Sequence, residues 1–369
     1  VSLKRIVIKI GTNVLQQTNR KLDYKLISEL TSQIARIRSN GHEVLLVSSG
    51  SVGAGRELFS VDESGNTLAS HQILASVGQA KLIQIYSDSF RKHKTTVAQI
   101  LLTRGDFGLR KSYLNIRNTL ENLLKYRIVP IVNENDVVAT EELDLNFGDN
   151  DLLAVYLATL IGADQLFFLT VAPGLLKEEE TAQGKQSKVV AKVEKLTEEI
   201  IQHCLPFTSA GGKGGMESKV RSAGMAMSFG IDTYIIDGKF PAGVFEIMEG
   251  RPLGTHFVAH GRKIRSYQKW LAAGALNKGT LIIDQGAEQA LLKNKKSLLA
   301  RGVARVEGQF EDKDLVEIHN LEGVKLGVGR ADCSAKELRY QIKERNLTNS
   351  KVNTRSGKPV IHRNHLFLE

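Results

Sequence analysis

An alternation of short apolar runs with longer amphipathic segments fills the first 260 residues and constrains the fold more than any other feature. The apolar runs are rich in Val, Ile and Leu, which favours strands buried on both faces. They cover residues 5–10, 43–47, 96–102, 128–132, 165–169 and 232–236. Between them, apolar residues recur at helical spacing over 24–39, 71–91, 113–126, 152–161 and 217–229. Strands that alternate with helices predict a mainly parallel sheet covered by helices on both faces.

The pattern changes near Gly250, where a polar and basic segment runs to Gln268 and indicates a linker. Beyond it we expect short strands at 280–283, 303–306, 314–319 and 324–328, with one helix at 287–293. Such short strands between Gly-rich and charged turns predict a small β-rich domain of roughly 80–100 residues. We place the first domain at 1–258, the linker at 259–274, and the β-rich domain with its C-terminal tail at 275–369.

A charged segment, the length of the apolar runs and the two cysteines predict which residues are exposed and where the protein is located. Residues 177–195 are charged and lack proline, which predicts an exposed, mobile loop. No apolar run approaches the ~18–20 residues of a membrane helix, and the N-terminal segment indicates a strand rather than a signal peptide. The chain has two cysteines, Cys204 and Cys333, which we expect to be reduced thiols. A cytoplasmic location is therefore expected, with no membrane partner.

The positive charge of the chain lies in its last third. Residues 262–369 hold 21 Lys and Arg against 12 Asp and Glu, a net of +9, whereas residues 1–261 hold 29 against 28, a net of +1. This asymmetry suits an anionic partner such as RNA, or a solvated basic surface. Aromatic residues are not interleaved with the basic ones, so the sequence leaves both alternatives open.

Three glycine-rich segments follow predicted strands or open predicted helices. They are residues 9–13 (KIGTN), 48–55 (SSGSVGAG) and 211–219 (GGKGGMESK). Backbone N–H groups in such turns, together with a helix N-terminus, can hold phosphate, although glycines after strands are also ordinary turn residues. No Gly-Lys pair is followed by Ser or Thr, and no Gly-x-Gly-x-x-Gly follows the first strand. The sequence thus disfavours both a P-loop and a dinucleotide-binding site.

A dense polar run follows the strand predicted at 128–132. It comprises residues 133–136 (NEND) and 148–151 (GDND), and the second group opens the next predicted helix. Ligands of open α/β sheets bind at the carboxyl ends of strands, which favours a polar ligand here. The alternative is that these residues serve as Asx turns and a helix N-cap.

These segments together resemble the amino acid kinase family and, within it, the glutamate 5-kinases. The matching residues are 7–12 (VIKIGT), 47–50 (VSSG), 102–104 (LTR), 133–136 (NEND), 148–151 (GDND) and 214–219 (GGMESK). Residues 279–287 and 297–302 resemble a PUA domain, a module named for RNA-modifying enzymes. The resemblance implies an αβα sandwich around a mainly parallel sheet, followed by a small β-rich PUA-like domain.

The family also implies a role for individual residues. Lys9 and Lys219 would hold the phosphoryl group in transit, and Asp151 would position both lysines. L-Glutamate would contact Ser49, Asp136 and Asn150, and the backbone N–H groups of Gly11 and Gly50 would donate to phosphate. ATP would be bound by Lys9, Gly11, Gly50, Thr170, Val171, Lys213, Gly214, Gly215, Met216, Glu217, Ser218 and Lys219. No residue is assigned to a metal, and Mg²⁺ is expected to accompany ATP.

The resemblance implies several partners and leaves two other activities open. The expected reaction is the phosphorylation of the γ-carboxylate of L-glutamate, the first step of proline biosynthesis. Proline as a feedback inhibitor, a glutamyl phosphate reductase as a partner, and a homo-oligomeric state are hypotheses from the family. RNA binding by the PUA-like domain stays open. The alternatives are a related carboxylate or carbamate kinase, and an RNA-binding protein with an inactive kinase domain.

The chain departs from the family pattern on the nucleotide side. Thr170 is followed by Val171 where the family usually has Asp, and the next residues, 172–176 (APGLL), are also unusual. Asn13 stands where Ser or Thr is common. The sequence therefore defines the amino-acid half of the expected site more sharply than the adenine half.

Overall fold

The computed structural model describes residues 2–61, 67–108, 110–138, 150–181, 184–202, 215–260, 278–348 and 358–368. The chain forms two compact units. The first comprises Val1–Thr103 with Asn115–Lys263, and the second comprises Arg104–Leu114 with Ile264–Glu369.

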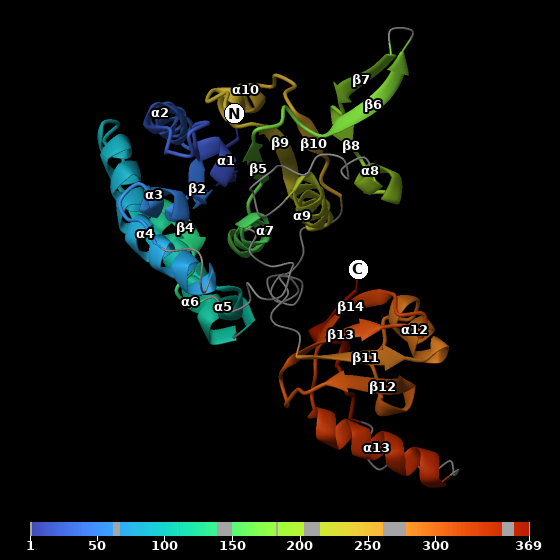
Figure 1. The fold of residues 1–369 in the computed structure, drawn as a ribbon. Coiled ribbons are helices and arrows are strands. Elements are labelled where there is room, and N and C mark those ends of the chain that lie inside the picture. The colour runs from blue at the N-terminus through green and yellow to red at the C-terminus, as the bar shows by residue number, and fades with distance from the viewer. Residues whose placement is uncertain are drawn as a thin grey trace. The chain divides into compact units, whose positions relative to one another are not determined.

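A mainly parallel sheet forms the centre of the first unit (Figure 1). Its strand order is β3-β4-β2-β1-β5-β9-β10-β8. The parallel strands are β1 (Arg5–Ile10), β2 (Glu43–Ser48), β3 (Val97–Leu102), β4 (Val129–Glu134), β5 (Gln165–Thr170) and β9 (Asp232–Asp237). The predicted strands are confirmed to within two residues at each end. Strand β3 lies at the edge of the sheet and is only partly buried, contrary to the expectation of a buried strand.

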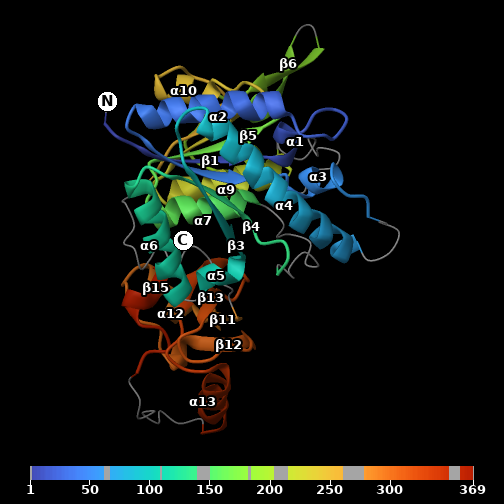
Figure 2. The ribbon, with the colours of Figure 1, turned by 90° about the vertical axis from the view of Figure 1, so that its left-hand side faces the viewer.

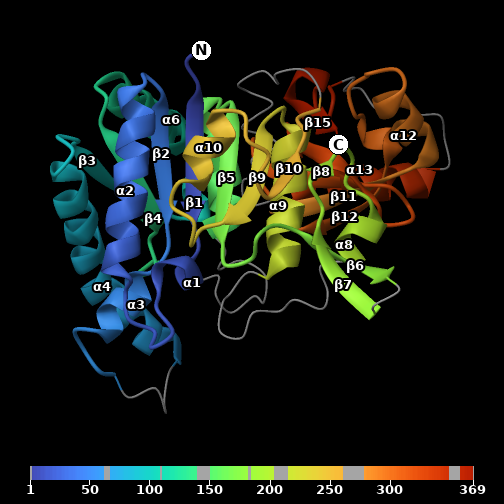
Figure 3. The same cartoon turned by 90° about the horizontal axis from the view of Figure 1, so that it is seen from above.

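Helices cover both faces of this sheet, as predicted. On one face lie α2 (Tyr24–Ser39), α4 (Thr67–Arg91) and α10 (Gly243–Met248), and on the other lie α7 (Asn150–Ile161) and α9 (Met216–Ser228) (Figures 2 and 3). Because successive side chains of a strand point to opposite faces, Ile6, Ile8 and Ile10 join the core under α2 and α4. Val7 and Lys9 therefore face α7 and α9, a placement that decides the site described below.

Two predictions about segments outside the central strands are wrong. Residues 177–195 are not a loop but contain an antiparallel hairpin of β6 (Leu176–Thr181) and β7 (Gly184–Val189), then β8 (Lys192–Val193). Opposite charges also meet across the hairpin, since Lys188 Nζ lies 3.8 Å from Glu179 Oε2. The segment from Gly250 to Gln268 contains β10 (Thr255–Phe257), which pairs antiparallel with β9.

The boundaries expected between the two domains fall largely on residues outside the described part of the chain. Of the predicted linker at 259–274, only Ala259 and His260 are described, and their backbone N–H groups donate to Asp232 and Met227 of the first unit.

The second unit is β-rich, as predicted. Its sheet has the order β12-β11-β13-β14-β15. The strands are β11 (Gly279–Ile283), β12 (Val303–Gly308), β13 (Leu315–His319), β14 (Lys325–Arg330) and β15 (Leu366–Leu368), and α12 (Gln285–Leu292) is the predicted helix. The C-terminal tail thus contributes a strand, because β15 pairs with β14.

Helix α13 (Ala335–Thr348) in this unit was not predicted. Its signal was a capping box: Ser334 Oγ accepts from the N–H of Glu337, and the Glu337 carboxylate accepts from the N–H of Ser334.

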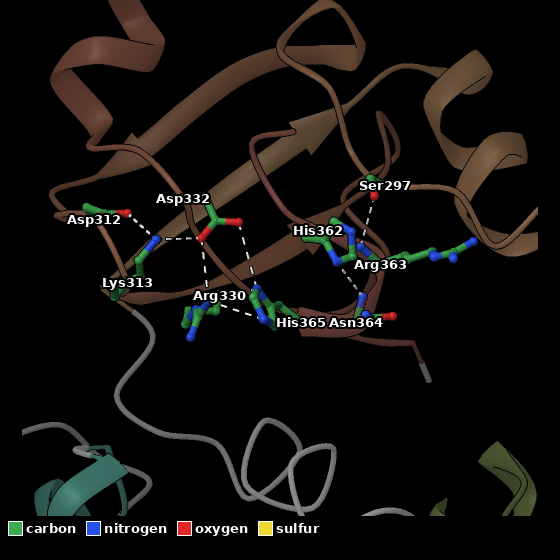
Figure 4. A network of polar contacts seen from close by, with 9 residues as sticks. All are labelled: Ser297, Asp312, Lys313, Arg330, Asp332, His362, Arg363, Asn364 and His365. Carbon is green, nitrogen blue, oxygen red and sulfur yellow. Dashed lines mark hydrogen bonds and ion pairs between the residues drawn. The ribbon is translucent and has the colours of Figure 1, made fainter. Parts of the chain in front are cut away.

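A polar cluster around Asp332 joins three segments of the second unit (Figure 4). The Asp332 carboxylate accepts from Lys313 Nζ at 2.7 Å and lies 3.5 Å from Arg330 Nη2 and 3.8 Å from His365 Nδ1. These contacts connect the turn before β13, the end of β14 and the residue before β15. None of the helices in the described parts of either unit has the length and apolar character needed to span a membrane.

Candidate active site

The candidate site lies at the carboxyl ends of β4, β2, β1, β5 and β9. In the sheet, β1 is flanked by β2 on one side and by β5 on the other. The strand order therefore changes direction at β1, with earlier strands on one side and later strands on the other. Ligands of open α/β sheets bind at such a switch point. The predicted residues that the structure describes lie in or directly after these strands, or at the starts of α7 and α9.

A buried carboxylate between two lysines is the central feature of the site. Asp151 in the first turn of α7 forms ion pairs with Lys9 on β1 and with Lys219 on α9, the latter at 3.1 Å. Asp151 is 0% exposed, Lys9 3% and Lys219 7%. Charges this deeply buried are stable only when they are paired, so the Asp151 carboxylate fixes the position of both ammonium groups. The three residues carry a net charge of +1, which suits an anion.

The loops after β1 and β2 pack closely against neighbouring strands. The N–H of Gly11 donates to the Leu169 carbonyl at 3.2 Å, and the N–H of Ser49 donates to the Ile10 carbonyl at 3.2 Å. A side chain on Gly11 would place its Cβ 3.3 Å from the Leu169 oxygen. Gly50 has φ +105, a left-handed conformation that glycine adopts without strain. The Gly11 N–H, expected to bind phosphate, is thus already engaged in this structure.

Polar side chains from four segments meet on the β2–β4 side of the site. Asn150 Nδ2 lies 3.0 Å from Ser49 Oγ and 3.0 Å from Asn133 Oδ1. Asp136 accepts a hydrogen bond from Ser51 Oγ at 3.1 Å. The predicted residues Ser49 and Asn150 therefore lie in one network with Asn133, and the predicted Asp136 contacts Ser51; Asn133 and Ser51 were not assigned a role. The sequence could have indicated both residues, because Ser51 lies in the glycine-rich segment 48–55 and Asn133 in the polar run 133–136.

A tyrosine lies behind this network. Tyr86 on α4 is fully buried and its hydroxyl lies 2.9 Å from Ser48 Oγ. Burial raises the pKa of Tyr86 to about 12, although the hydrogen bond to Ser48 acts in the opposite direction. Tyr86 is therefore neutral at physiological pH and acts as a hydrogen-bonding group beside the β2 loop.

The β5–β9 side of the site includes the end of β5 and the start of α9. Thr170 ends β5, and its carbonyl accepts from the N–H of Gly238 at 2.7 Å. Val171 is 47% exposed and offers no polar side-chain atom. Gly215 precedes α9, with nothing within 4 Å of the position that a Cβ would occupy.

The remaining residues expected to bind ATP are placed as follows. Met216 is buried and Glu217 forms an ion pair with Arg221 at 2.7 Å, while Ser218 follows in the first turn of α9. Lys213 and Gly214 lie outside the described residues. Within the described ranges no group of three His, Cys, Asp or Glu side chains could hold a metal ion. Both oxygens of Asp151 are already engaged by lysines.

The chain matches known families and proteins over most of its length. The model of the amino acid kinase family matches residues 4–237, and that of the PUA domain matches residues 279–350. A glutamate 5-kinase of Dehalococcoides mccartyi is 38% identical over 99% of this chain and 98% of that protein. Glutamate 5-kinases of Chlorobaculum tepidum and Nostoc punctiforme are 39% and 37% identical, each over 99% of this chain and 97% and 99% of those proteins.

Solved structures show the same fold at lower identity. Carbamate kinase from Giardia lamblia, bound to AMP-PNP, superimposes with a TM-score of 0.50 at 17% identity and covers 70% of this chain and 99% of that one.

Proposed function

Since the chain belongs to the amino acid kinase family and, within it, to the glutamate 5-kinases, we propose that it transfers the terminal phosphoryl group of ATP to the side-chain carboxylate of L-glutamate. The observation that carries this proposal is the buried Lys9–Asp151–Lys219 triad at the carboxyl ends of the central strands. The product is L-glutamyl 5-phosphate, an acyl phosphate.

The chemistry requires positive charge and positioning rather than a general base. The side-chain carboxyl of glutamate has a reference pKa of ~4.3 and is already an anion at neutral pH. The barrier is the approach of this anion to a polyanionic triphosphate. Groups that stabilise the charge of the transferring phosphoryl group lower that barrier. Lys9 and Lys219 supply two fixed ammonium groups, and Asp151 positions them through opposite oxygens.

The two halves of the site take the two substrates on either side of β1. Ser49, Asp136 and Asn150 suit the ammonium and carboxylate of a free amino acid, because they combine a negative charge with hydroxyl and amide groups. ATP is proposed to lie over β5 and α9, contacting Thr170, Val171 and residues 213–219. The backbone N–H of Gly50 would donate to a phosphate of ATP. Gly11 would contribute because it has no side chain to occupy the space beside β5 where ATP is proposed to lie.

Mg²⁺ is proposed to enter with ATP as part of the substrate. This ion binds chiefly to phosphate oxygens and retains several waters, so it does not need a cage of protein carboxylates. When bound, it would neutralise phosphate charge beside the two lysines.

A hydroxamate assay with ATP, Mg²⁺ and L-glutamate tests the reaction directly, because hydroxylamine traps the acyl phosphate. Formation of γ-glutamyl hydroxamate together with ADP is the expected result. Turnover of N-acetylglutamate or of carbamate in place of glutamate would assign the chain to a different substrate. No ATP turnover, combined with salt-sensitive RNA binding, would favour the inactive-kinase alternative.

Several regulatory and cellular properties stay predictions from the family resemblance. They are inhibition by proline, a homo-oligomeric state, delivery of the labile product to a reductase, RNA binding by the second unit, and a cytoplasmic location. Proline inhibition that is competitive with glutamate is the form that we expect.

A further inference from the structure

Three side-chain amides form a chain beside the amino-acid half of the site. Asn150 Nδ2 at the start of α7 lies 3.0 Å from Asn133 Oδ1 at the end of β4. Asn133 Nδ2 in turn donates to Gln79 Oε1 on α4 at 2.8 Å. Asn133 is buried, and Gln79 is half-buried. Gln79 has no role in the site as described so far.

Backbone groups determine which end of each side-chain amide donates and which accepts in this row of hydrogen bonds. The oxygen and nitrogen of a side-chain amide can be exchanged by a flip, so the direction must come from partners with one possible role. The N–H of Glu134 can only donate, and it lies 3.0 Å from Asn133 Oδ1. The carbonyl of Ser48 can only accept, and it lies 3.2 Å from Asn150 Nδ2. Both asparagines are thereby oriented, and Asn133 must turn its NH₂ group toward Gln79.

The orientation leaves Asn150 with an unused acceptor. Its Nδ2 is surrounded by acceptors, namely the Ser48 carbonyl, Ser49 Oγ and Asn133 Oδ1. Its Oδ1 is buried and, within the described part of the chain, accepts no hydrogen bond. A buried oxygen without a donor is unfavourable, and a ligand that brings a donor removes that cost. The α-ammonium of an amino acid is such a donor.

Gln79 is held in place by the packing of its helix. A Cβ on its neighbour Gly78 would lie 1.8 Å from the Ser51 carbonyl oxygen and 2.3 Å from Gly55 N. The backbone of α4 therefore touches the backbone of α3 (Ser51–Arg56), the helix that follows the β2 loop. This contact places the Gln79 side chain at a defined distance from Asn133.

We propose that Gln79 is a positioning residue for the amino-acid substrate. It accepts the NH₂ group of Asn133, which holds Asn133 Oδ1 against Asn150 Nδ2 and keeps Asn150 Oδ1 directed at the substrate's ammonium group. Without this acceptor, the buried NH₂ group of Asn133 loses its partner, and the asparagine rotates to find another. The inference rests on the function proposed above.

Steady-state kinetics of Gln79→Leu tests the role. Leucine has a similar volume but accepts no hydrogen bond, so we expect kcat/KM for glutamate to fall about tenfold or more, with KM for ATP unchanged within about twofold. Gln84→Leu is the matched control on the same helix, because Gln84 is exposed and its side chain donates to Asp88 one turn away. Gln79→Glu keeps an acceptor oxygen and should retain most of the activity.

A double-mutant cycle shows whether Gln79 acts through Asn133. With Asn133→Ala as background, Gln79→Leu should cause no further loss, because the hydrogen bond is already gone. Additive losses would show that Gln79 acts by another route and would overturn the inference. If Asn133→Ala does not fold, the comparison of Gln79→Leu with Gln79→Glu decides: equal losses in both variants would also overturn it.

Failure of this inference is distinguishable from failure of the proposed function. A wild-type chain that forms no γ-glutamyl hydroxamate would remove the proposed function. An active wild-type chain whose Gln79→Leu variant has unchanged kinetics would remove the inference alone. Thermal melting of each variant confirms that the comparison is made between folded proteins.

Discussion

At the scale of single residues, burial holds the charged side chains of Lys9, Asp151 and Lys219 in fixed positions. Lysine on a surface moves freely, whereas Lys9 and Lys219 are almost fully buried and share one carboxylate. In such surroundings electrostatic interactions are screened much less than in water. An anion that reaches the two ammonium groups therefore meets charge that needs no reorganisation.

The variant Lys219→Ala should lower kcat at least about a hundredfold, which is the size of effect seen when one preorganised charge-stabilising group is removed. Lys25→Ala is the control, because Lys25 is exposed and its ammonium group forms a long, solvent-exposed ion pair of 4.0 Å with Glu29 on the same helix. Turnover in the hydroxamate assay gives the measurement, and thermal melting gives the folding control. Near-normal turnover of Lys219→Ala would refute the role assigned to this lysine.

At the scale of elements, the crossing of α3 and α4 controls the shape of the amino-acid half. The two helices touch through backbone atoms at Gly55 and Gly78, where any side chain would overlap the other helix. Ser51, the first residue of α3, also holds Asp136. Packing between the two helices thus reaches the site through Ser51.

Substitution of Gly78 by alanine should separate the two helices. The added Cβ meets backbone atoms that cannot rotate away, so we expect the free energy of unfolding to fall by about 1–3 kcal/mol or more. Ser76→Ala, at an exposed position of the same helix, should change it by less than about 0.5 kcal/mol. Urea unfolding measures both, and equal stability of the two variants would contradict the close crossing.

At the scale of the whole molecule, the chain builds two units with separate cores. One core lies between the large sheet and the helices α2, α4 and α10, and the other lies within the sheet and helices of the second unit. The second unit depends in part on charged groups, because Asp332 pairs with Lys313 and Arg330, and Arg330 Nη2 in turn lies 2.8 Å from His365 Nδ1 in the C-terminal segment. Its stability should therefore respond to pH.

The titration of His365 and Asp332 gives the sign of that response. Burial, followed by the charge of Arg330, lowers the pKa of His365. Burial raises the pKa of Asp332, but the hydrogen bond and charge of Lys313 outweigh it, so the net pKa is lowered. Both groups thus bind protons more readily when unfolded. The contribution of His365 is complete above the reference His pKa of ~6.5 and is lost as pH falls below it, whereas that of Asp332 is lost only below the reference Asp pKa of ~3.9.

We expect the protection of β14 and β15 amides from hydrogen exchange to decrease between about pH 7.5 and 5, after correction for intrinsic exchange rates. In His365→Gln this decrease should be smaller, because the neutral glutamine does not titrate. The same pH dependence in both proteins would show that His365 is not responsible. His362, whose ring stacks edge-on against His365 at 5.7 Å, is left unchanged in this test.

The sequence by itself determined the strands, most helices and the site motifs. Hydrophobic periodicity is a local property, so it located the parallel strands and α2, α4, α7 and α9 to within a few residues. It missed α13, because only Ala335 and Leu338 are buried among residues 335–344 and no continuous apolar stripe marks the helix. It also missed the β6–β7 hairpin, which rests on cross-strand pairs of polar residues rather than on apolar alternation.

Only the tertiary structure decided how distant residues meet. Lys9, Asp151 and Lys219 are more than sixty positions apart in the chain, yet the alternation of β1 side chains and the packing of α7 and α9 bring them together. The amide chain through Gln79 likewise depends on contacts between α4, β4 and α7. A motif states which chemical groups are present, whereas burial, hydrogen-bond direction and helix crossings are properties of packing. The local sequence does not encode these in any single segment.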